Sequence, residues 1–201
     1  MSVQKKDCGC NSRRNLLLAT SVVGGAGVVA ATIPFVVSMS PSERAKTAGA
    51  SVVADISKLA PGEKMVVKWR GNPIWILRRT QAMLDSLDAV VGKLSDPDSK
   101  NSIQPAYAQN KARAIKDEYF VALGICTHLG CSPTDKLRPG SSEGMPSDWV
   151  GGFLCPCHST SFDLAGRVFK DQPAPTNLSI PPHKYLSDTE ILIGEDDSKG
   201  A

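Results

Sequence analysis

The sequence predicts a mainly β protein, in which a small antiparallel β domain follows a single N-terminal transmembrane helix. Three observations support this prediction: an uncharged apolar run near the start of the chain, short strand-like runs after it, and two clusters of cysteine and histidine among the later runs. The 201 residues allow one ordinary domain plus an appendage, and 41% hydrophobic residues suffice for a single core.

The charge of the chain argues against nucleic-acid binding. Its formal net charge is only +3 at pH 7, and no tract of lysine and arginine is interleaved with aromatic residues. A nucleic-acid-binding surface normally shows a basic patch or stripe. We therefore expect no nucleic-acid partner.

Residues 16–37 read LLLATSVVGGAGVVAATIPFVV and contain no charged side chain. An α-helix rises about 1.5 Å per residue, so a run of this length can cross a hydrocarbon core of about 30 Å. Gly24, Gly25 and Gly27 lower the helix propensity, but glycine is common where membrane helices pack closely. We expect a transmembrane helix that contacts partner helices.

Residues 1–15 are polar and locally basic, and Arg13 and Arg14 precede the apolar run. This arrangement resembles a bacterial twin-arginine (Tat) export signal. It implies a single-pass protein of the bacterial inner membrane, and the positive-inside rule places the N-terminus in the cytoplasm and the head in the periplasm. A cleaved signal is the alternative, because residues 48–50 form a small-x-small site. The apolar run is longer than the core of about 7–15 residues in removable signals, which favours a retained anchor.

Residues 38–51 are mostly small and polar and show no hydrophobic period. We expect a linker here, between the anchor and a head formed by residues 52–201. Such a linker could let the head move, or it could be a passive spacer, and the sequence favours neither.

The head contains six short runs that predict strands, separated by glycine, proline and aspartate. These runs are residues 52–56, 64–69, 73–79, 118–124, 151–155 and 190–194. Residues 80–93 place Met83 and Leu87 at a helical interval, which predicts one helix against the sheet. Residues 96–116 show no clear period, so we expect a loop.

Two motifs carry the chemistry: CTHLGC, residues 126–131, and CPCH, residues 155–158. Each contains cysteine and histidine, and only one of the three histidines of the chain lies outside them. Thiolate and imidazole together can bind either zinc or iron. Structural zinc sites usually pair cysteine with cysteine and histidine with histidine, whereas each motif here pairs unlike ligands, which disfavours zinc.

The two motifs resemble those of the Rieske iron-sulfur proteins, in which two cysteines hold one iron of a [2Fe-2S] cluster and two histidines hold the other. The anchor, the linker and the closing segment FDLAGRVFKDQPAPTNLSIPP also resemble the Rieske subunit of the bacterial cytochrome bc1 complex, so the likeness covers most of the chain. It implies a Rieske-type antiparallel β-sandwich head with a small cluster-binding subdomain at about residues 124–178.

The resemblance implies a role for each cysteine and histidine of the motifs. The cluster ligands that it implies are Cys126, His128, Cys155 and His158. It implies that the two remaining cysteines, Cys131 and Cys157, form a disulfide, which an oxidising periplasm permits.

Neutral imidazole ligands remove negative charge from the cluster and raise its reduction potential, so that it can accept electrons from a quinol. Their outer ring nitrogens can also change protonation with the redox state. The resemblance implies that His158 faces the quinol as the catalytic residue, while Leu129 and Pro156 help to shield the iron from water.

The segment after His158 departs from the family pattern, which usually reads Gly-Ser-x-Tyr or Phe-Asp. Thr160 stands where a serine hydroxyl normally donates to a bridging sulfide, and it keeps that hydroxyl on a stiffer side chain. Phe162 cannot donate to a ligand sulfur as tyrosine does, so we expect a lower potential than in tyrosine-bearing relatives. Ser159 replaces a glycine, which leaves the local backbone geometry open.

Residues 171–175, DQPAP, resemble the proline loop that covers the cluster in the family, with Pro173 near the cluster. Gln172 occupies a position often held by glycine, and an ordinary turn is the alternative. His183 has no cysteine beside it, so we expect a surface or sheet-edge histidine without a role.

Cys8 and Cys10 would lie on the cytoplasmic side, where thiols stay reduced, and Cys-x-Cys alone is a weak metal signal. We expect core or partner-contact positions for the three tryptophans, Trp69, Trp75 and Trp149.

The resemblance implies the electron-transfer subunit of a quinol:cytochrome c reductase, a proton-translocating enzyme of the respiratory chain. Such a subunit takes an electron from quinol at cytochrome b, with a proton through His158, and passes the electron to cytochrome c1 in a dimeric complex. Two alternatives stay open. A soluble Rieske ferredoxin would tend to lack the anchor and the extra cysteine pair, and a zinc-stapled interaction module would give no EPR signal after reduction. The sequence does not distinguish ubiquinol from menaquinol.

Overall fold

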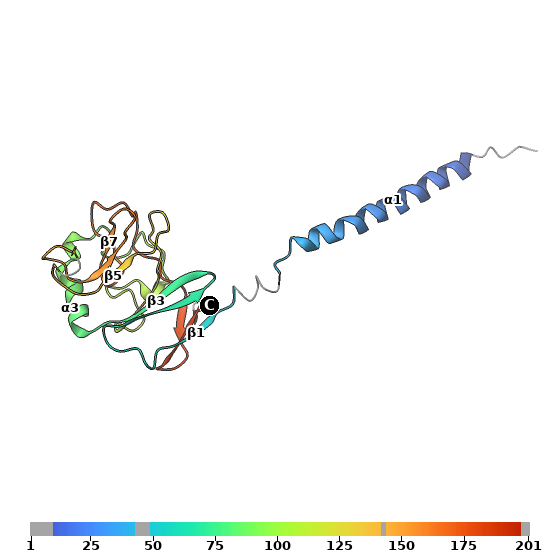
Figure 1. Cartoon of the computed structure of the whole chain (residues 1–201). Coiled ribbons are helices and arrows are strands. Elements are labelled where there is room, and N and C mark those ends of the chain that lie inside the picture. The colour runs from blue at the N-terminus through green and yellow to red at the C-terminus, as the bar shows by residue number, and fades with distance from the viewer. Residues whose placement is uncertain (1–9, 43–48, 142–143, 198–201) are drawn as a thin grey trace, which may run out of the picture. The chain divides into compact units, whose positions relative to one another are not determined.

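The computed structural model describes residues 10–42, 49–141 and 144–197 (Figure 1). The chain divides into two compact units, Met1–Thr47 and Ala48–Ala201, and each is described by itself. Cys8 and residues 43–48 of the expected linker lie outside the described residues.

The described part of the first unit is dominated by one helix, α1 (Cys10–Ser38), which contains the whole predicted apolar run. The hydroxyl groups of Thr20 and Thr32 donate to backbone carbonyls of the preceding turn, to Leu16 at 2.9 Å and to Val29 at 2.8 Å. In a lipid environment, polar groups must form their hydrogen bonds within the protein, as these hydroxyl groups do. By length and composition the helix can cross a membrane, and the predicted N-terminal apolar helix is confirmed.

The head contains, in the part that the structure describes, three antiparallel sheets of three strands each (Figure 1). The first sheet consists of β1 (Val52–Asp55), β9 (Glu190–Ile193) and β8 (His183–Tyr185), in that order. The second consists of β2 (Lys64–Trp69), β3 (Asn72–Arg78) and β4 (Tyr119–Leu123). The third consists of β5 (Thr134–Lys136), β6 (Gly152–Leu154) and β7 (Ser161–Phe162).

All six predicted strands are present, as β1, β2, β3, β4, β6 and β9. The sequence did not predict β5, β7 and β8, which are two or three residues long. β6 is equally short, but its apolar residues Phe153 and Leu154 were visible in the sequence, whereas β5 (TDK) and β8 (HKY) are mostly polar and β7 has only two residues.

The β2-β3-β4 sheet is the middle layer of the head, because β3 is buried on both faces. Successive side chains of a strand point to opposite faces. Ile74 and Ile76 belong to one core, shared with β1 and β9, and Trp75 and Leu77 belong to a second core, shared with β6 and β7. This arrangement confirms the predicted sandwich and explains the continuous apolar run in β3.

The predicted helix is present as α3 (Gln81–Ala89) and is shorter than expected. The hydroxyl of Thr80 caps it by accepting a hydrogen bond from the backbone N–H of Met83 at 3.3 Å. Leu87 is buried in the second core. After α3 the chain tightens into the 3₁₀ turn η1 (Val91–Lys93). Residues 96–116 are irregular as expected, apart from the 3₁₀ turn η2 (Ala106–Ala108).

His183 lies on β8, an edge strand of its sheet, which is one of the two expected positions, but the side chain is not at the surface. The side chain is only 1% exposed. Its Nδ1 lies 2.9 Å from the carbonyl oxygen of Pro181, and its ring packs edge-on against Tyr107 with 5.4 Å between the centroids. The covering residue comes from η2, far away in the sequence, so no local pattern could reveal the burial.

The three tryptophans are buried as expected. Trp69 belongs to the first core and Trp75 to the second, and the indole N–H of Trp149 donates to the carbonyl oxygen of Lys136 at 2.8 Å.

Candidate metal centre

The first motif forms a closed loop between β4 and β5. The backbone N–H of Cys126 donates to the carbonyl oxygen of Cys131 at 2.7 Å, and the N–H of Gly130 donates to the carbonyl oxygen of Cys126 at 3.1 Å. Gly130 has φ +84°, which glycine adopts without strain. The motif therefore turns back on itself and brings its two cysteines together.

The second motif forms a similar loop between β6 and β7. The backbone N–H of Cys155 donates to the carbonyl oxygen of Thr160 at 2.7 Å. Ser159 has φ +57° and stands directly before the residue that closes the loop, as Gly130 does in the first loop. The backbone geometry left open by the sequence is therefore left-handed, and Ser159 adopts it at a cost that glycine would not have.

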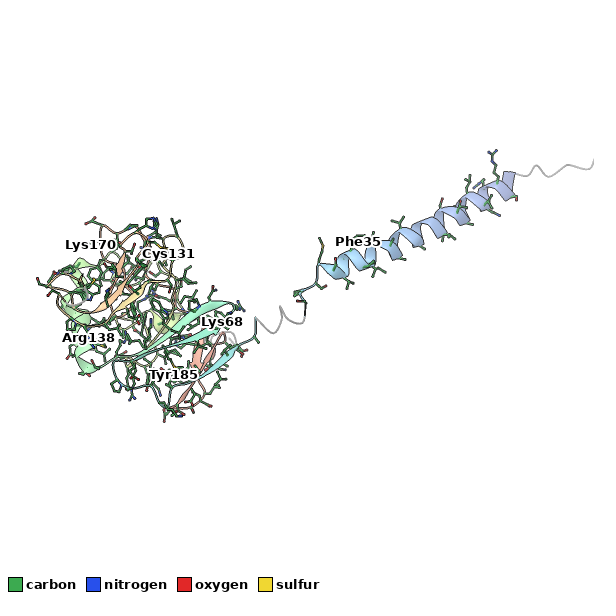
Figure 2. All side chains as sticks on the ribbon, viewed as in Figure 1. Phe35, Lys68, Cys131, Arg138, Lys170 and Tyr185 are labelled. Carbon is green, nitrogen blue, oxygen red and sulfur yellow. A yellow bond between two sulfur atoms is a disulfide. The ribbon has the colours of Figure 1, made fainter. Side chains whose placement is uncertain are left out.

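A disulfide between Cys131 and Cys157 joins the two loops, as predicted. The sulfur of Cys155 lies within 4.8 Å of both disulfide sulfurs. Figure 2 shows Cys131 at the end of the head where Figure 1 places β5 and β7, while Tyr185 lies toward the opposite end. The disulfide thus ties both loops together beside the thiol of Cys155.

The other two cysteines and the two histidines of the motifs occupy different depths. The free thiols of Cys126 and Cys155 are 2% and 1% exposed. The rings of His128 and His158 are 4.6 Å apart and nearly perpendicular, at 80°. His128 is half-buried and His158 is exposed. Solvent exposure therefore increases from the two buried cysteines through the half-buried His128 to the exposed His158.

Burial raises the pKa of the Cys126 thiol, and a hydrogen bond from the backbone N–H of His128 opposes this rise. A buried thiolate without a partner is costly, because desolvation disfavours the charged form. Metal coordination deprotonates a thiol outright. The buried thiols are therefore suited to a metal centre.

Two buried polar atoms of this region have no hydrogen-bond partner among the described residues: Nδ1 of His128 and the hydroxyl oxygen of Thr160. Thr160 is fully buried. Buried polar groups are nearly always satisfied, so each such atom needs an explanation. A cluster that offers iron to the imidazole and sulfide to the hydroxyl would satisfy both. The donor set of two thiols and two imidazoles fits a [2Fe-2S] cluster of the mixed-ligand kind.

The other residues expected around the cluster are divided between surface and core. Leu129 is 72% exposed at the tip of the first loop, and Pro156 in the second loop and Pro173 are exposed as well. Phe162 is fully buried in the same core as Cys126 and Cys155. The aromatic ring thus lies behind the loops and the exposed residues lie at their outer side.

The entrance to the first loop depends on contact between Gly124 and Trp75. A Cβ atom added to Gly124 would overlap the indole ring of Trp75. The backbone N–H of Gly124 also donates to the carbonyl oxygen of Pro73 at 2.8 Å. The middle sheet therefore sets the point from which the first loop departs.

Three buried arginines hold the chain behind the second loop, and sequence reasoning missed them. Arg167 pairs with the buried carboxylate of Asp163, Arg79 donates to the carbonyls of Ala112 and Leu164, and Arg113 donates to those of Ala165, Gly166 and Leu178. Burial lowers the pKa of Arg79 and of Arg113 to about 10, so both remain charged at neutral pH. Arg79 directly follows the apolar strand β3, and this position could have indicated a buried arginine. A fully buried arginine is rare unless it is paired, so such a residue would also have predicted a partner.

A β-sandwich head whose two loops present buried thiols, adjacent imidazoles and a joining disulfide defines an iron-sulfur protein with mixed cysteine and histidine ligands. The model of the Rieske [2Fe-2S] domain matches residues 49–182. A second family model, described as "Ubiquitinol-cytochrome C reductase Fe-S subunit TAT signal", matches residues 4–42. The predicted twin-arginine signal is thereby confirmed.

Curated relatives extend the match over most of the chain. The ubiquinol-cytochrome c reductase iron-sulfur subunit of Allochromatium vinosum is 59% identical over 184 residues, covering 92% of this chain and 88% of that subunit. The corresponding subunit of Cereibacter sphaeroides is 38% identical over 189 residues, covering 91% of this chain and 95% of the relative. The chain belongs to the Rieske iron-sulfur subunit family of ubiquinol-cytochrome c reductases.

Among solved structures, a chain of the hyperthermophilic respiratory Complex III is similar, with a TM-score of 0.47 and 24% identity over 87% of this chain and 97% of that one. The cofactor of the family is the Rieske [2Fe-2S] cluster, as the motifs predicted.

Proposed function

We propose that this chain is the electron-transfer subunit of a quinol:cytochrome c reductase and holds its cluster within a subdomain at about residues 124–178. The proposed ligands are Cys126, His128, Cys155 and His158. The observation that carries the proposal is the gradient of exposure in the second loop, where Cys155 is buried and His158 is exposed. The loop thus offers one ligand to the interior and one to a substrate outside.

When bound, the cluster would supply a one-electron acceptor with a potential raised by its histidine ligands. The outward ring nitrogen of His158 would accept a hydrogen bond and then a proton from a quinol hydroxyl. Leu129 and Pro156, exposed on the adjacent loop tips, would exclude water from the contact. Removal of a proton together with an electron is what quinol oxidation needs.

The relatives' names support the partners in this proposal, since they are subunits of ubiquinol-cytochrome c reductases. Quinol would bind in cytochrome b, and the reduced head would pass its electron to cytochrome c1 of a dimeric complex. The twin-arginine signal and α1 support an anchor in the inner membrane with the head in the periplasm. Residues 38–51 would serve as the tether on which the head moves. The anchor and the disulfide also distinguish the chain from the soluble ferredoxin expected to lack them.

The ligand assignment is tested by EPR of the reduced full-length protein, with iron and acid-labile sulfide measured in the same samples. His158→Gln should abolish the [2Fe-2S] signal. His183→Gln is the matched control, because His183 lies outside both loops, and it should leave the signal unchanged. A wild-type protein with bound zinc and no EPR signal would contradict the proposal, as would an unchanged spectrum in His158→Gln.

The proposed movement of the head is tested by quinol-dependent reduction of cytochrome c in membranes that contain the complex. Prolines introduced into residues 38–51 should slow turnover while the EPR signal of the reduced cluster stays the same. Unchanged turnover with the stiffened linker would show that the head does not need to move.

A further inference from the structure

The peptide unit between Thr160 and Ser161 is held at both of its ends. Its carbonyl oxygen, on Thr160, accepts the 2.7 Å hydrogen bond from the backbone N–H of Cys155. Its N–H, on Ser161, donates to Oε1 of Gln172 at 3.2 Å. A side chain from a separate loop therefore completes the hydrogen bonding of the unit that closes the second motif.

The hydrogen bond of Gln172 lies on the outer edge of β7. Ser161 is paired with Leu154 of β6 on one side, and on the other its carbonyl oxygen accepts a hydrogen bond from the N–H of Phe169 at 3.3 Å. The backbone after Phe169 does not continue this pairing. In place of a neighbouring strand, the carboxamide oxygen of Gln172 accepts the hydrogen bond from the N–H of Ser161 at this edge.

The backbone on both sides of Gln172 restricts where its side chain can point. Asp171 has φ +56°, a left-handed conformation that is costly for a residue other than glycine. Pro173 follows, and the residue before a proline is confined to extended conformations. Local strain of this kind persists only where the surroundings hold it in place.

The same loop is fixed to the first motif at its far end, where the hydroxyl of Thr127 donates to the carbonyl oxygen of Thr176 at 2.6 Å. The segment between Gln172 and Thr176 is thereby attached to both cluster loops by side-chain hydrogen bonds. Ser161 and Gln172 also line a cavity of about 490 Å³. Water from this cavity would reach the Ser161 amide if the carboxamide were removed.

We propose that Gln172 is a positioning residue for the cluster: its carboxamide fixes the Thr160–Ser161 peptide, and through it the direction of the buried Thr160 hydroxyl. This inference rests on the proposed ligands. Gln172 does not touch the ligands itself. Its effect runs through a chain of two hydrogen bonds across one peptide, and such chains strengthen each member. Thr160 is the affected group because its hydroxyl is fully buried, makes no hydrogen bond of ordinary geometry among the described residues, and lies close enough to the Cys126 thiol to lower the pKa of that thiol.

The reduction potential of the full-length protein, measured by redox titration with EPR detection, tests the inference. Gln172→Met keeps the length of the side chain and removes the acceptor. It should make reduction less favourable by about threefold to tenfold, the range of a single hydrogen bond. A tenfold change corresponds to about 59 mV for a one-electron couple. Gln81→Met is the matched control, because the amide of Gln81 donates to Asp85 on the exposed face of α3, and the potential of this variant should equal that of the wild type.

A double-mutant cycle separates this route from a general loosening of the fold. Thr160→Val removes the hydroxyl and keeps the shape of the side chain, so it should lower the potential by itself. If Gln172 acts through that hydroxyl, Gln172→Met should change the potential by less than about twofold in the Thr160→Val protein, because coupled residues are not additive. Equal effects of Gln172→Met in both proteins would overturn the inference.

Hydrogen exchange at the Ser161 amide gives a second readout that does not depend on the potential. Gln172→Met should speed its exchange, and Gln172→Glu, which retains an acceptor oxygen, should restore slow exchange. Unchanged exchange in Gln172→Met would overturn the inference. A wild-type protein without the [2Fe-2S] signal would overturn the proposed function and this inference together, whereas a normal wild type with an unchanged Gln172→Met potential would overturn the inference alone.

Discussion

Nε of Arg167 donates to Oδ2 of Asp163 at 2.7 Å, and both side chains are buried. Oδ1 of the same carboxylate accepts from the backbone N–H groups of Ala165 at 3.0 Å and Arg167 at 2.7 Å. The carboxylate of Asp163 thus stabilises the turn at residues 163–167 and also pairs with the side chain of Arg167. The negative charge of Asp163 also acts on Arg79 and Arg113. It raises the pKa of both guanidinium groups and so opposes the lowering that burial causes.

Asp163→Asn should therefore destabilise the head strongly. The substitution keeps the shape of the side chain and leaves buried guanidinium groups without their carboxylate, which typically costs about 3–5 kcal/mol. Urea unfolding of the full-length protein measures the change. Asp188→Asn is the control, because its ion pair with Lys116 lies at the surface, and its unfolding midpoint should match the wild type. A midpoint unchanged in Asp163→Asn would contradict this account.

Gly124→Ala should destabilise the head and disturb the first loop. The added methyl group would overlap the ring of Trp75, and overpacking in a core costs about 1–3 kcal/mol. Gly92→Ala provides the comparison, because the structure describes no atom within 4 Å of a Cβ at that position. Thermal unfolding and iron content are the measurements. Equal stability of the two variants would show that Trp75 can move aside.

Ser159 and Gly130 occupy corresponding left-handed positions, so opposite substitutions should have opposite effects. Ser159→Gly should stabilise the protein slightly, because relief of a left-handed strain of about 1–2 kcal/mol is partly offset by the flexibility of glycine in the unfolded chain. Gly130→Ser should destabilise it. Denaturant midpoints of the two variants check the prediction, and a loss of stability in Ser159→Gly would show that the serine side chain makes a compensating contact.

Phe162→Tyr should raise the reduction potential. Phe162 shares a buried core with Cys126 and Cys155, so an added phenol hydroxyl would lie in the same environment as the sulfurs of these two proposed ligands. A hydrogen bond to a sulfur stabilises the reduced cluster, and a tenfold gain corresponds to about 59 mV. Redox titration is the measurement. The absence of a rise would mean that the hydroxyl points away from the sulfurs.

The stability of the head should fall as the pH is lowered through the range where histidine titrates. Burial lowers the pKa of His183, with weaker opposing effects from the Pro181 carbonyl and from Asp196. At pH values below about 6.5, the usual value for histidine, the unfolded state therefore binds a proton that the folded state resists. Linkage then makes stability decrease as the pH falls. His183→Gln should flatten the dependence of the urea midpoint on pH below about 6.5, and an unchanged slope would assign the effect to another group.

The twin-arginine signal, the apolar run and the two motifs of cysteine and histidine could be found in the sequence because each is a local pattern. A membrane helix must satisfy its backbone within one segment, and the proposed ligands Cys155 and His158 lie only three residues apart in the chain. The longer strands were also found locally, as short runs bounded by glycine, proline and aspartate. The disulfide partners Cys131 and Cys157 came from family likeness, since nothing local pairs two distant cysteines.

The burial of His183, the network around Arg113 and the hydrogen bond that the Ser161 N–H donates to Gln172 depended on the tertiary structure. Each joins segments that are brought together only when the sheets pack, and each places a polar side chain where a sequence pattern favours the surface. The sequence therefore determined which chemical groups are present and where they lie along the chain. Packing decided which of them are removed from water and what they contact, because burial depends on neighbours that come from other parts of the fold.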